Sequence, residues 1–171
     1  MDITQLILDD HQEQRRLFAI LEQVERTNGE ALAAIWSRLS AFLEVHAEAE
    51  ERHFYPTLLK VGTGAGGRPS AGAETEHAIK DHNEIRDAVR EVSGHEPGSD
   101  PWWDAVEKAR IANSEHMAEE ERQDLADFRR HADLQTRHDI AVEFLRYEAE
   151  HAQGITPENH DPEAWVAEHK A

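Results

Sequence analysis

The sequence predicts an all-α protein: a four-helix, up-down-up-down bundle with an additional C-terminal helix and an extended tail. Apolar residues recur every three or four positions through long segments, as they do in amphipathic helices. Two stretches rich in glycine and proline, residues 61–72 and 94–101, interrupt this pattern and indicate loops. Long helices joined by short connections pack antiparallel to their neighbours in sequence, which is the plan of a bundle.

The spacing of the apolar residues sets the expected helices. The first is expected from about Thr4 to Arg26 and the second from about Glu30 towards Lys60. Pro56 marks a kink or the final turn of the second helix, because proline cannot continue its backbone hydrogen bonds. The third helix is expected over residues 73–92 and the fourth over residues 100–130.

The fourth helix and the segments after it carry their own signals. Asp100 is expected to cap the fourth helix, with Pro101 at its first position. Residues 133–151 are amphipathic and predict a fifth helix that packs across the bundle. Residues 154–171 hold two prolines and scattered polar residues, so we expect an extended tail on the surface.

Length and charge limit the classes of function. A chain of 171 residues fits one domain, and we expect residues 1–132 to form the bundle and residues 133–171 to pack on it. The formal net charge of −18 repels nucleic acid and anionic membranes, so neither is an expected partner. The N-terminus lacks the features of a signal peptide and no segment approaches the ~18 apolar residues of a membrane span, which predicts a cytoplasmic protein. We expect it to act as a monomer.

The chain has twelve histidines and no cysteine. The absence of thiols removes disulfides, thiolate zinc sites, iron–sulfur clusters and cysteine nucleophiles. Any metal ion must therefore take nitrogen or oxygen ligands, and histidine is the commonest metal ligand in proteins. Most of the histidines are expected at the surface, and His95, His131 and His160 are expected to be replaceable without effect.

One pairing of histidine and glutamate occurs twice, as His46 with Glu50 and as His116 with Glu120. Residues four apart on a helix differ by about 40° in direction, so each pair faces one way. A carboxylate can bridge two cations while the histidine binds one of them. One such pair alone is usually a surface pair, but both pairs are in register with apolar residues, where unpaired polar groups are costly. Together they predict a dinuclear metal site.

The first and third helices each offer an inward histidine. His11 follows Ile7 by four residues and so belongs to the apolar face of the first helix. In the third helix, His82 lies within about 40° of the mean apolar direction, whereas His77 lies about 100° away. A lone histidine on an apolar face is more often a hydrogen-bonded core residue, but His82 is a better candidate ligand than His77.

Four motifs occur in order along the chain. They are Asp10-His11, His46-x-x-x-Glu50-Glu51 followed by Phe54-Tyr55-Pro56, His82-Asn-Glu-Ile-Arg86, and His116-x-x-x-Glu120-Glu121. In this combination the chain resembles the hemerythrin-like, or HHE cation-binding, family over residues 2 to about 130. The segment that follows also resembles the C-terminal extension of actinobacterial members.

The resemblance implies a non-haem site in which two iron ions share an oxo or hydroxo bridge. Histidine and carboxylate ligands without sulfur suit iron, manganese or zinc, and iron is the metal that the family implies. The implied ligands are His11 and His46 for one iron, His82 and His116 for the other, and Glu50 and Glu120 as the bridging carboxylates.

The chain departs from the oxygen carriers of that family at two places. Those proteins have a further histidine four residues before the one that matches His82, where this sequence has Ala78. They also carry the second bridging acid one residue later, which would select Glu121, although spacing favours Glu120. The substitute for the missing histidine stays open. The candidates are His53, which follows His46 by seven residues and so shares its face, and then His77, Asp81, Tyr55 and Tyr147.

A bridged pair of iron ions with an open position can bind dioxygen or peroxide. Loss of a neutral histidine stabilises ferric iron, so the favoured function is catalase-like disposal of hydrogen peroxide. Some of the actinobacterial members that the chain resembles are associated with peroxide or nitric oxide stress.

Three alternatives remain at this point. One is a non-enzymatic module that binds or senses oxygen, iron or nitric oxide. Another is a ferritin-like di-iron oxidase, because Glu50-x-x-His53 and Glu74-x-x-His77 match its paired motifs. The third is a helical interaction protein without metal.

Overall fold

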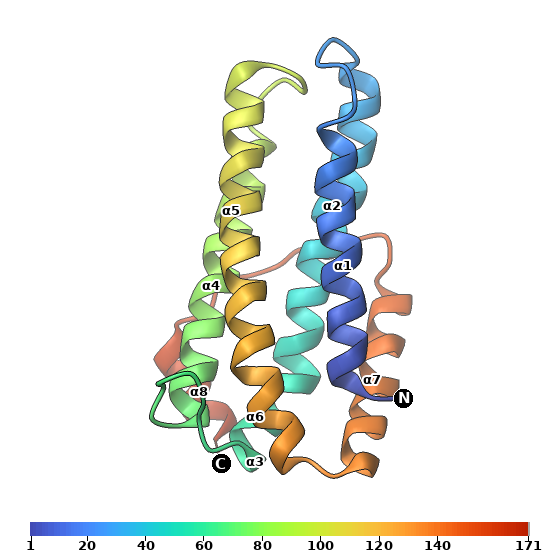
Figure 1. Ribbon diagram of the computed structural model, residues 1–171. Helices are drawn as coiled ribbons and strands as arrows, with labels where there is room; N and C mark the ends of the chain where they lie inside the picture. The colour runs from blue at the N-terminus through green and yellow to red at the C-terminus, as the bar shows by residue number, and fades with distance from the viewer. Residues whose placement is uncertain (171) are drawn as a thin grey trace.

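Four long helices run side by side and antiparallel in the computed structural model, which describes residues 1–170 (Figure 1). They are α1 (Ile3–Leu21), α2 (Gly29–Ala49), α4 (Ala71–Val92) and α5 (Asp100–Arg122). The described residues include no β-strand. The prediction of an all-α, four-helix bundle is confirmed.

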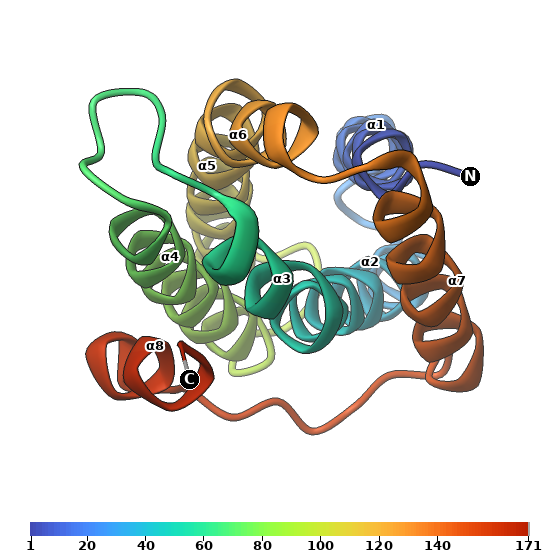
Figure 2. The same cartoon turned by 90° about the horizontal axis from the view of Figure 1, so that it is seen from below.

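Shorter elements close one end of the bundle and cover its sides. They are the π-helical turn η1 (Glu50–Phe54), α3 (Tyr55–Val61), α6 (Asp124–His131), α7 (Leu134–Glu150) and α8 (Pro162–His169). The helix α7 is the predicted fifth helix, and it packs outside the bundle against α1 and α2 (Figure 2). On the other side, α8 packs against α4, so the chain after α7 crosses a face of the bundle.

The tail is only partly extended, because it ends in the helix α8. The sequence analysis did not predict this helix. The Asp161 side chain accepts from the backbone N–H of Ala164, and Pro162 occupies the first turn. The helix buries Trp165 and Val166 against the lower part of the core. A helix this short is not stable by itself, so the burial of these two side chains stabilises it.

Two helix ends differ from the prediction. The helix α1 ends at Leu21 rather than Arg26, and the chain turns through the following residues to Asn28, which caps α2. The predicted fourth helix breaks at Gln123, where the backbone φ of −116° and ψ of −74° depart from helical values. The cap of α5 is Ser99 rather than Asp100, because the Ser99 hydroxyl accepts from the N–H of Trp102.

The turn before Pro56 is wider than an α-helical turn. In η1 the backbone N–H of Tyr55 donates to the carbonyl of Glu50, five residues earlier. Pro56 has no N–H to donate, yet the helix resumes as α3 and continues to Val61. The predicted irregularity at Pro56 is therefore a π turn just before it, a feature that often lies at functional sites.

Two apolar clusters fill the core, one towards each end of the long helices. One includes Leu39, Leu43, Ile85 and Trp102, and the other includes Ile7, Phe54, Ile79 and Phe128. Between them each long helix carries buried polar residues. These are His11 and Gln14 in α1, His46 in α2, His82 and Arg86 in α4, and Asn113, His116 and Glu120 in α5, with Glu50 at the start of η1. The bundle therefore has a polar layer in the middle of its core.

No helix within residues 1–170 combines the length and the apolar character that a membrane crossing requires.

Candidate metal centre

The six residues that the motifs indicate meet in this polar layer. They are His11, His46, Glu50, His82, His116 and Glu120, and each is at most 4% exposed. All four long helices and the first residue of η1 supply them, so the cluster exists only in the folded bundle. Polar side chains this deeply buried are costly unless they are paired or bound to a ligand.

Glu50 lies at the centre of the cluster. Its Oε1 is 3.0 Å from His46 Nε2, and its Oε2 is 3.2 Å from His82 Nε2 and 3.9 Å from His116 Nε2. Two groups of ligand atoms share this carboxylate: one with His11 and His46, the other with His82 and His116. Oε1 of Glu50 thus faces His46, and Oε2 faces His82 and His116.

Glu120 approaches the cluster from α5. Its Oε2 is 3.2 Å from His11 Nε2 and 4.0 Å from His116 Nε2. Its Oε1 accepts a hydrogen bond of 2.9 Å from the hydroxyl of Tyr55. The neighbouring Glu121 contacts His11 at Nδ1 instead, at 2.9 Å. The position favoured by helical spacing, Glu120, is therefore the one that faces the Nε2 atoms of two histidines.

Several buried atoms of the cluster have no hydrogen-bond partner among the described residues. They are Nε2 of His11, both ring nitrogens of His46, both carboxylate oxygens of Glu50, and Oε2 of Glu120. Buried polar atoms are nearly always satisfied, so a group of unsatisfied lone-pair atoms that point together requires an explanation. Nitrogen and oxygen donors in this arrangement fit a pair of metal cations.

The second glutamate of each motif contacts a histidine from another helix. Glu51 Oε1 lies 2.7 Å from His82 Nδ1, and Glu121 Oε1 lies 2.9 Å from His11 Nδ1. A carboxylate accepts hydrogen bonds, so it holds the proton on Nδ1 and leaves the Nε2 lone pair facing the cluster. Each of these glutamates also pairs with an arginine one turn after the histidine, Arg86 at 2.9 Å and Arg15 at 2.7 Å.

The other two histidines have acidic neighbours at Nδ1 as well. His46 Nδ1 lies 3.4 Å from Asp10 and 3.7 Å from Glu148, and His116 Nδ1 lies 3.7 Å from Asp81. All four histidines therefore turn Nδ1 towards a carboxylate. This outer ring is what orients the imidazoles of a metal site.

The outer ring follows a repeat that the sequence analysis missed. Asp10-His11-x-x-x-Arg15 in α1 matches Asp81-His82-x-x-x-Arg86 in α4. Asp10 contacts His46 and Asp81 contacts His116, so each aspartate contacts the histidine of the next His-x-x-x-Glu motif. Arg15 contacts Glu121 and Arg86 contacts Glu51, so each arginine contacts the second glutamate of such a motif. Comparing the residues around His11 with those around His82 could have revealed it.

The carboxylates also shift the acidities of the buried groups. Burial by itself lowers the pKa of His46, but Glu50, Asp10 and Glu148 raise that pKa well above its usual value. Burial raises the pKa of Tyr55 well above its usual value, and Glu120 raises it further. Because protons and metal ions compete for the same imidazole nitrogens, metal binding here releases protons.

Two histidines proposed as extra ligands lie outside the cluster. His53 packs against the ring of Tyr147, with ring centroids 5.9 Å apart, because the π turn of η1 shifts it off the face of His46. His77 pairs with Asp81 at 3.1 Å on the rim of α4. Of the extra candidates, Tyr55 comes nearest to the cluster through its hydrogen bond to Glu120.

Neither ferritin-like pair brings both of its side chains to the cluster. Glu74 accepts from the backbone N–H of Ala65 in the glycine-rich loop, and His77 faces Asp81. In the other pair Glu50 is central but His53 turns away. The paired Glu-x-x-His reading of the sequence is therefore not supported by the fold.

The tail contributes a contact that the sequence analysis did not predict. His160 was expected to be replaceable, yet its Nε2 lies 3.4 Å from Glu51 Oε2. Two backbone hydrogen bonds with the Asn83 side chain, of 2.7 and 3.0 Å, hold His160 against α4. Together with Glu148 of α7, His160 shows that the C-terminal segment completes the outer ring.

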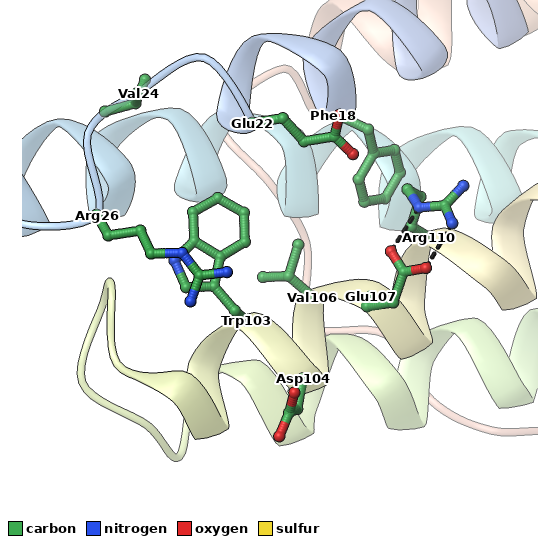
Figure 3. Close-up of a pocket in the computed structure, with 9 residues that line it drawn as sticks. All are labelled: Phe18, Glu22, Val24, Arg26, Trp103, Asp104, Val106, Glu107 and Arg110. Atoms are coloured by element: carbon green, nitrogen blue, oxygen red, sulfur yellow. Dashed lines mark hydrogen bonds and ion pairs between the residues drawn. The ribbon is translucent and has the colours of Figure 1, made fainter.

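A hollow lies away from the histidines, near the far ends of α1 and α5 (Figure 3). Phe18, Trp103 and Val106 form its apolar wall, and Glu107 and Arg110 pair at its edge. None of the six cluster residues lines it. This hollow is therefore separate from the histidine cluster of the polar layer.

The fold and the polar layer define the class: a helical bundle with a buried histidine and carboxylate cluster suited to cations. Residues 2–128 match the family model described as hemerythrin HHE cation binding domain, which is more than half of the chain. The chain belongs to this cation-binding family, as its motifs predicted. Comparison with curated proteins gave no match, and comparison with solved structures gave none.

Proposed function

We propose that the chain is a non-haem di-iron protein that reacts with hydrogen peroxide or dioxygen, with catalase-like disposal of peroxide as its main activity. The observation that carries this proposal is the convergence of four histidine Nε2 atoms on Glu50 and Glu120 in a layer sealed from solvent. Nitrogen and oxygen donors of this kind suit iron, and two carboxylates suit a bridged pair.

The ligand sets follow from the contacts. His11, His46 and Oε1 of Glu50 would hold one ion, and His82, His116 and Oε2 of Glu50 the other. Oε2 of Glu120 faces one histidine from each set, which suits a second bridge. The site would be completed by an oxo or hydroxo group.

Two iron ions held in this way would supply a two-electron couple, by which two molecules of hydrogen peroxide become one of dioxygen and two of water. The protein's part is to hold the ligands and to control protons. The carboxylates of Glu121 and Glu51 keep the protons of His11 and His82 on Nδ1. The Tyr55 hydroxyl donates to Glu120 and lies 3.5 Å from Asp124, so it connects the cluster to a second buried acid.

The position of the missing histidine supports an incomplete ligand set. Ala78 borders a narrow space of about 10 Å³, which also touches His116, Glu120 and Asp124. A space of this size admits about one water molecule. The ion held by His82 and His116 would therefore take a solvent ligand where the oxygen carriers have a histidine.

The experiment that tests the proposal loads the metal-free chain with iron and measures three quantities. We expect roughly two irons per chain, near-ultraviolet absorption from a bridged ferric pair, and dioxygen release when hydrogen peroxide is added. The same chain loaded with zinc is the control, since zinc has no redox chemistry. Two bound irons without dioxygen release would overturn the peroxide activity and leave the metal site intact.

A second candidate function is metal or oxygen sensing without turnover. It is favoured by the unpaired buried atoms of the cluster, because a metal that satisfies them stabilises the fold by mass action. This reading predicts a large rise in Tm on iron loading together with no dioxygen release from peroxide.

A further inference from the structure

The polar layer contains a buried amide pair that the metal ligands do not explain. Asn113 Nδ2 donates to Gln14 Oε1 at 2.9 Å and lies 3.7 Å from Met117 Sδ. Gln14 is 1% exposed and Asn113 is 3% exposed. The Gln14 amide nitrogen, Nε2, has no partner within residues 1–170. A buried N–H donor without a partner is destabilising unless something binds to it.

This pair lies directly next to the histidines. Gln14 follows His11 by three residues in α1, and Asn113 precedes His116 by three residues in α5. Three residues of a helix rise about 4.5 Å and bring the side chain back to the same face. Because α1 and α5 are antiparallel, both amides lie on the same side of the cluster.

The matching positions in the other two helices are apolar. Ile85 follows His82 by three residues, and Leu43 precedes His46 by three. Both belong to the adjacent apolar cluster of the core. Apolar side chains therefore lie next to His46 and His82, whereas an amide donor lies next to His11. An amide is not needed to fill this layer, since Leu43 and Ile85 fill the equivalent space.

The contact between α1 and α5 offers a route to this donor. A hollow of about 300 Å³ between the two helices is lined by Arg15, Phe18 and Met117, among others. It shares Phe18, Glu22 and Arg110 with the hollow of Figure 3. Met117 is buried beside Asn113, and its flexible, unbranched side chain separates the hollow from the amides.

We propose that Gln14 Nε2 donates a hydrogen bond to a small anionic ligand, of the size of hydroperoxide or azide, bound on the His11 side of the metal centre. This inference rests on the proposed function and names a hydrogen-bond donor for its ligand. The space next to Ala78 holds about one water, so a ligand of several atoms does not fit there. Asn113 fixes the amide so that Nε2 is the free end.

The test compares Gln14→Met with Ile85→Met in the iron-loaded full chain. Methionine resembles glutamine in shape but has no N–H, and Ile85 is the repeat-related position without a donor. Azide is titrated and followed by its visible charge-transfer band. We expect the Kd of azide to rise about tenfold in Gln14→Met and to stay unchanged in Ile85→Met, because a hydrogen bond to a charged group is lost in the first alone.

Iron content separates the possible failures. If the unmodified chain binds no iron, the proposed function fails and this inference fails with it. If Gln14→Met keeps two irons and binds azide within twofold of the unmodified chain, the inference alone is overturned. Should Gln14→Met lose iron, Gln14→Glu replaces it, because glutamate keeps the shape and the acceptor for Asn113. We expect azide binding to weaken at least as much there, and unchanged binding would overturn the inference.

Discussion

The two seams of the bundle that flank the metal centre differ in what covers them. At the seam between α4 and the α2–η1 junction, Glu51 and Arg86 are buried, and His160 of the tail contacts Glu51. At the α1–α5 seam, the corresponding Glu121 and Arg15 side chains are 26% and 37% exposed, and Arg15 borders the hollow between these helices. The same local motif thus gives a sealed contact on one side and a solvated one on the other.

The sequence repeat therefore sets which residues pair, while the surrounding elements set how much each pair contributes to stability. An ion pair removed from water loses much stability when one partner is deleted, whereas a solvated pair contributes little. The sealed seam is therefore suited to holding the fold, and the open seam to admitting a ligand.

The largest effect is expected from the carboxylate shared by both sides. Glu50→Ala removes contacts to three histidines, so the chain should retain fewer than one iron where the unmodified protein holds roughly two. Glu120→Ala removes fewer contacts and should retain more iron. Elemental analysis of both variants measures this, and full iron content in Glu50→Ala would contradict the shared bridge.

The next effect compares the two seams directly. Glu51→Ala leaves the buried Arg86 guanidinium without its closest partner and should lower the free energy of unfolding by about 3 kcal/mol. Glu121→Ala exposes a partly solvated Arg15 and should cost at most about 1 kcal/mol. Urea unfolding of both metal-free variants measures the two losses in the free energy of unfolding. Equal losses would mean that burial does not distinguish the two seams.

A smaller effect, dependent on pH, is expected below the centre, where Glu74 and Asp127 hold the glycine-rich loop. Burial and the nearby Asp127 raise the pKa of Glu74 from 4.5 to about 7. Stability from the protonated acid is complete below pH 4.5 and is lost as pH rises through about 7. Glu74→Gln mimics the protonated form, so its Tm should exceed that of the unmodified chain at pH 8 and match it at pH 4.5. A constant difference at both pH values would exclude this cause.

The smallest effect is expected from the tail. His160→Ala removes a 3.4 Å contact to Glu51 but leaves the hydrogen bond that His82 Nδ1 donates to Glu51, so iron affinity should fall measurably, by up to about tenfold. The matched control is His95→Ala, in the loop between α4 and α5. Competition with a chelator measures both affinities, and an identical affinity in the two variants would remove His160 from the outer ring.

The helices and the inward faces could be predicted because both are local properties. Apolar spacing predicted the four long helices, and the 40° offset of His46 and Glu50 predicted that they would face the same way. The same rule favoured Glu120 over Glu121. It failed for His53, because the rule assumes an unbroken α-helix and the π turn of η1 shifts the face.

Apolar spacing and the ordered motifs were enough to predict the all-helical class, the family and the six side chains that meet in the polar layer. Which carboxylate holds which imidazole depends on how the helices dock, since His11 and Glu121 are far apart in the chain and adjacent in space. Docking also brings Glu148 and His160 to the outer ring and leaves the Gln14 amide nitrogen without a partner among the described residues. Helical periodicity fixes the direction of a side chain from its own element, but its partners depend on how elements dock.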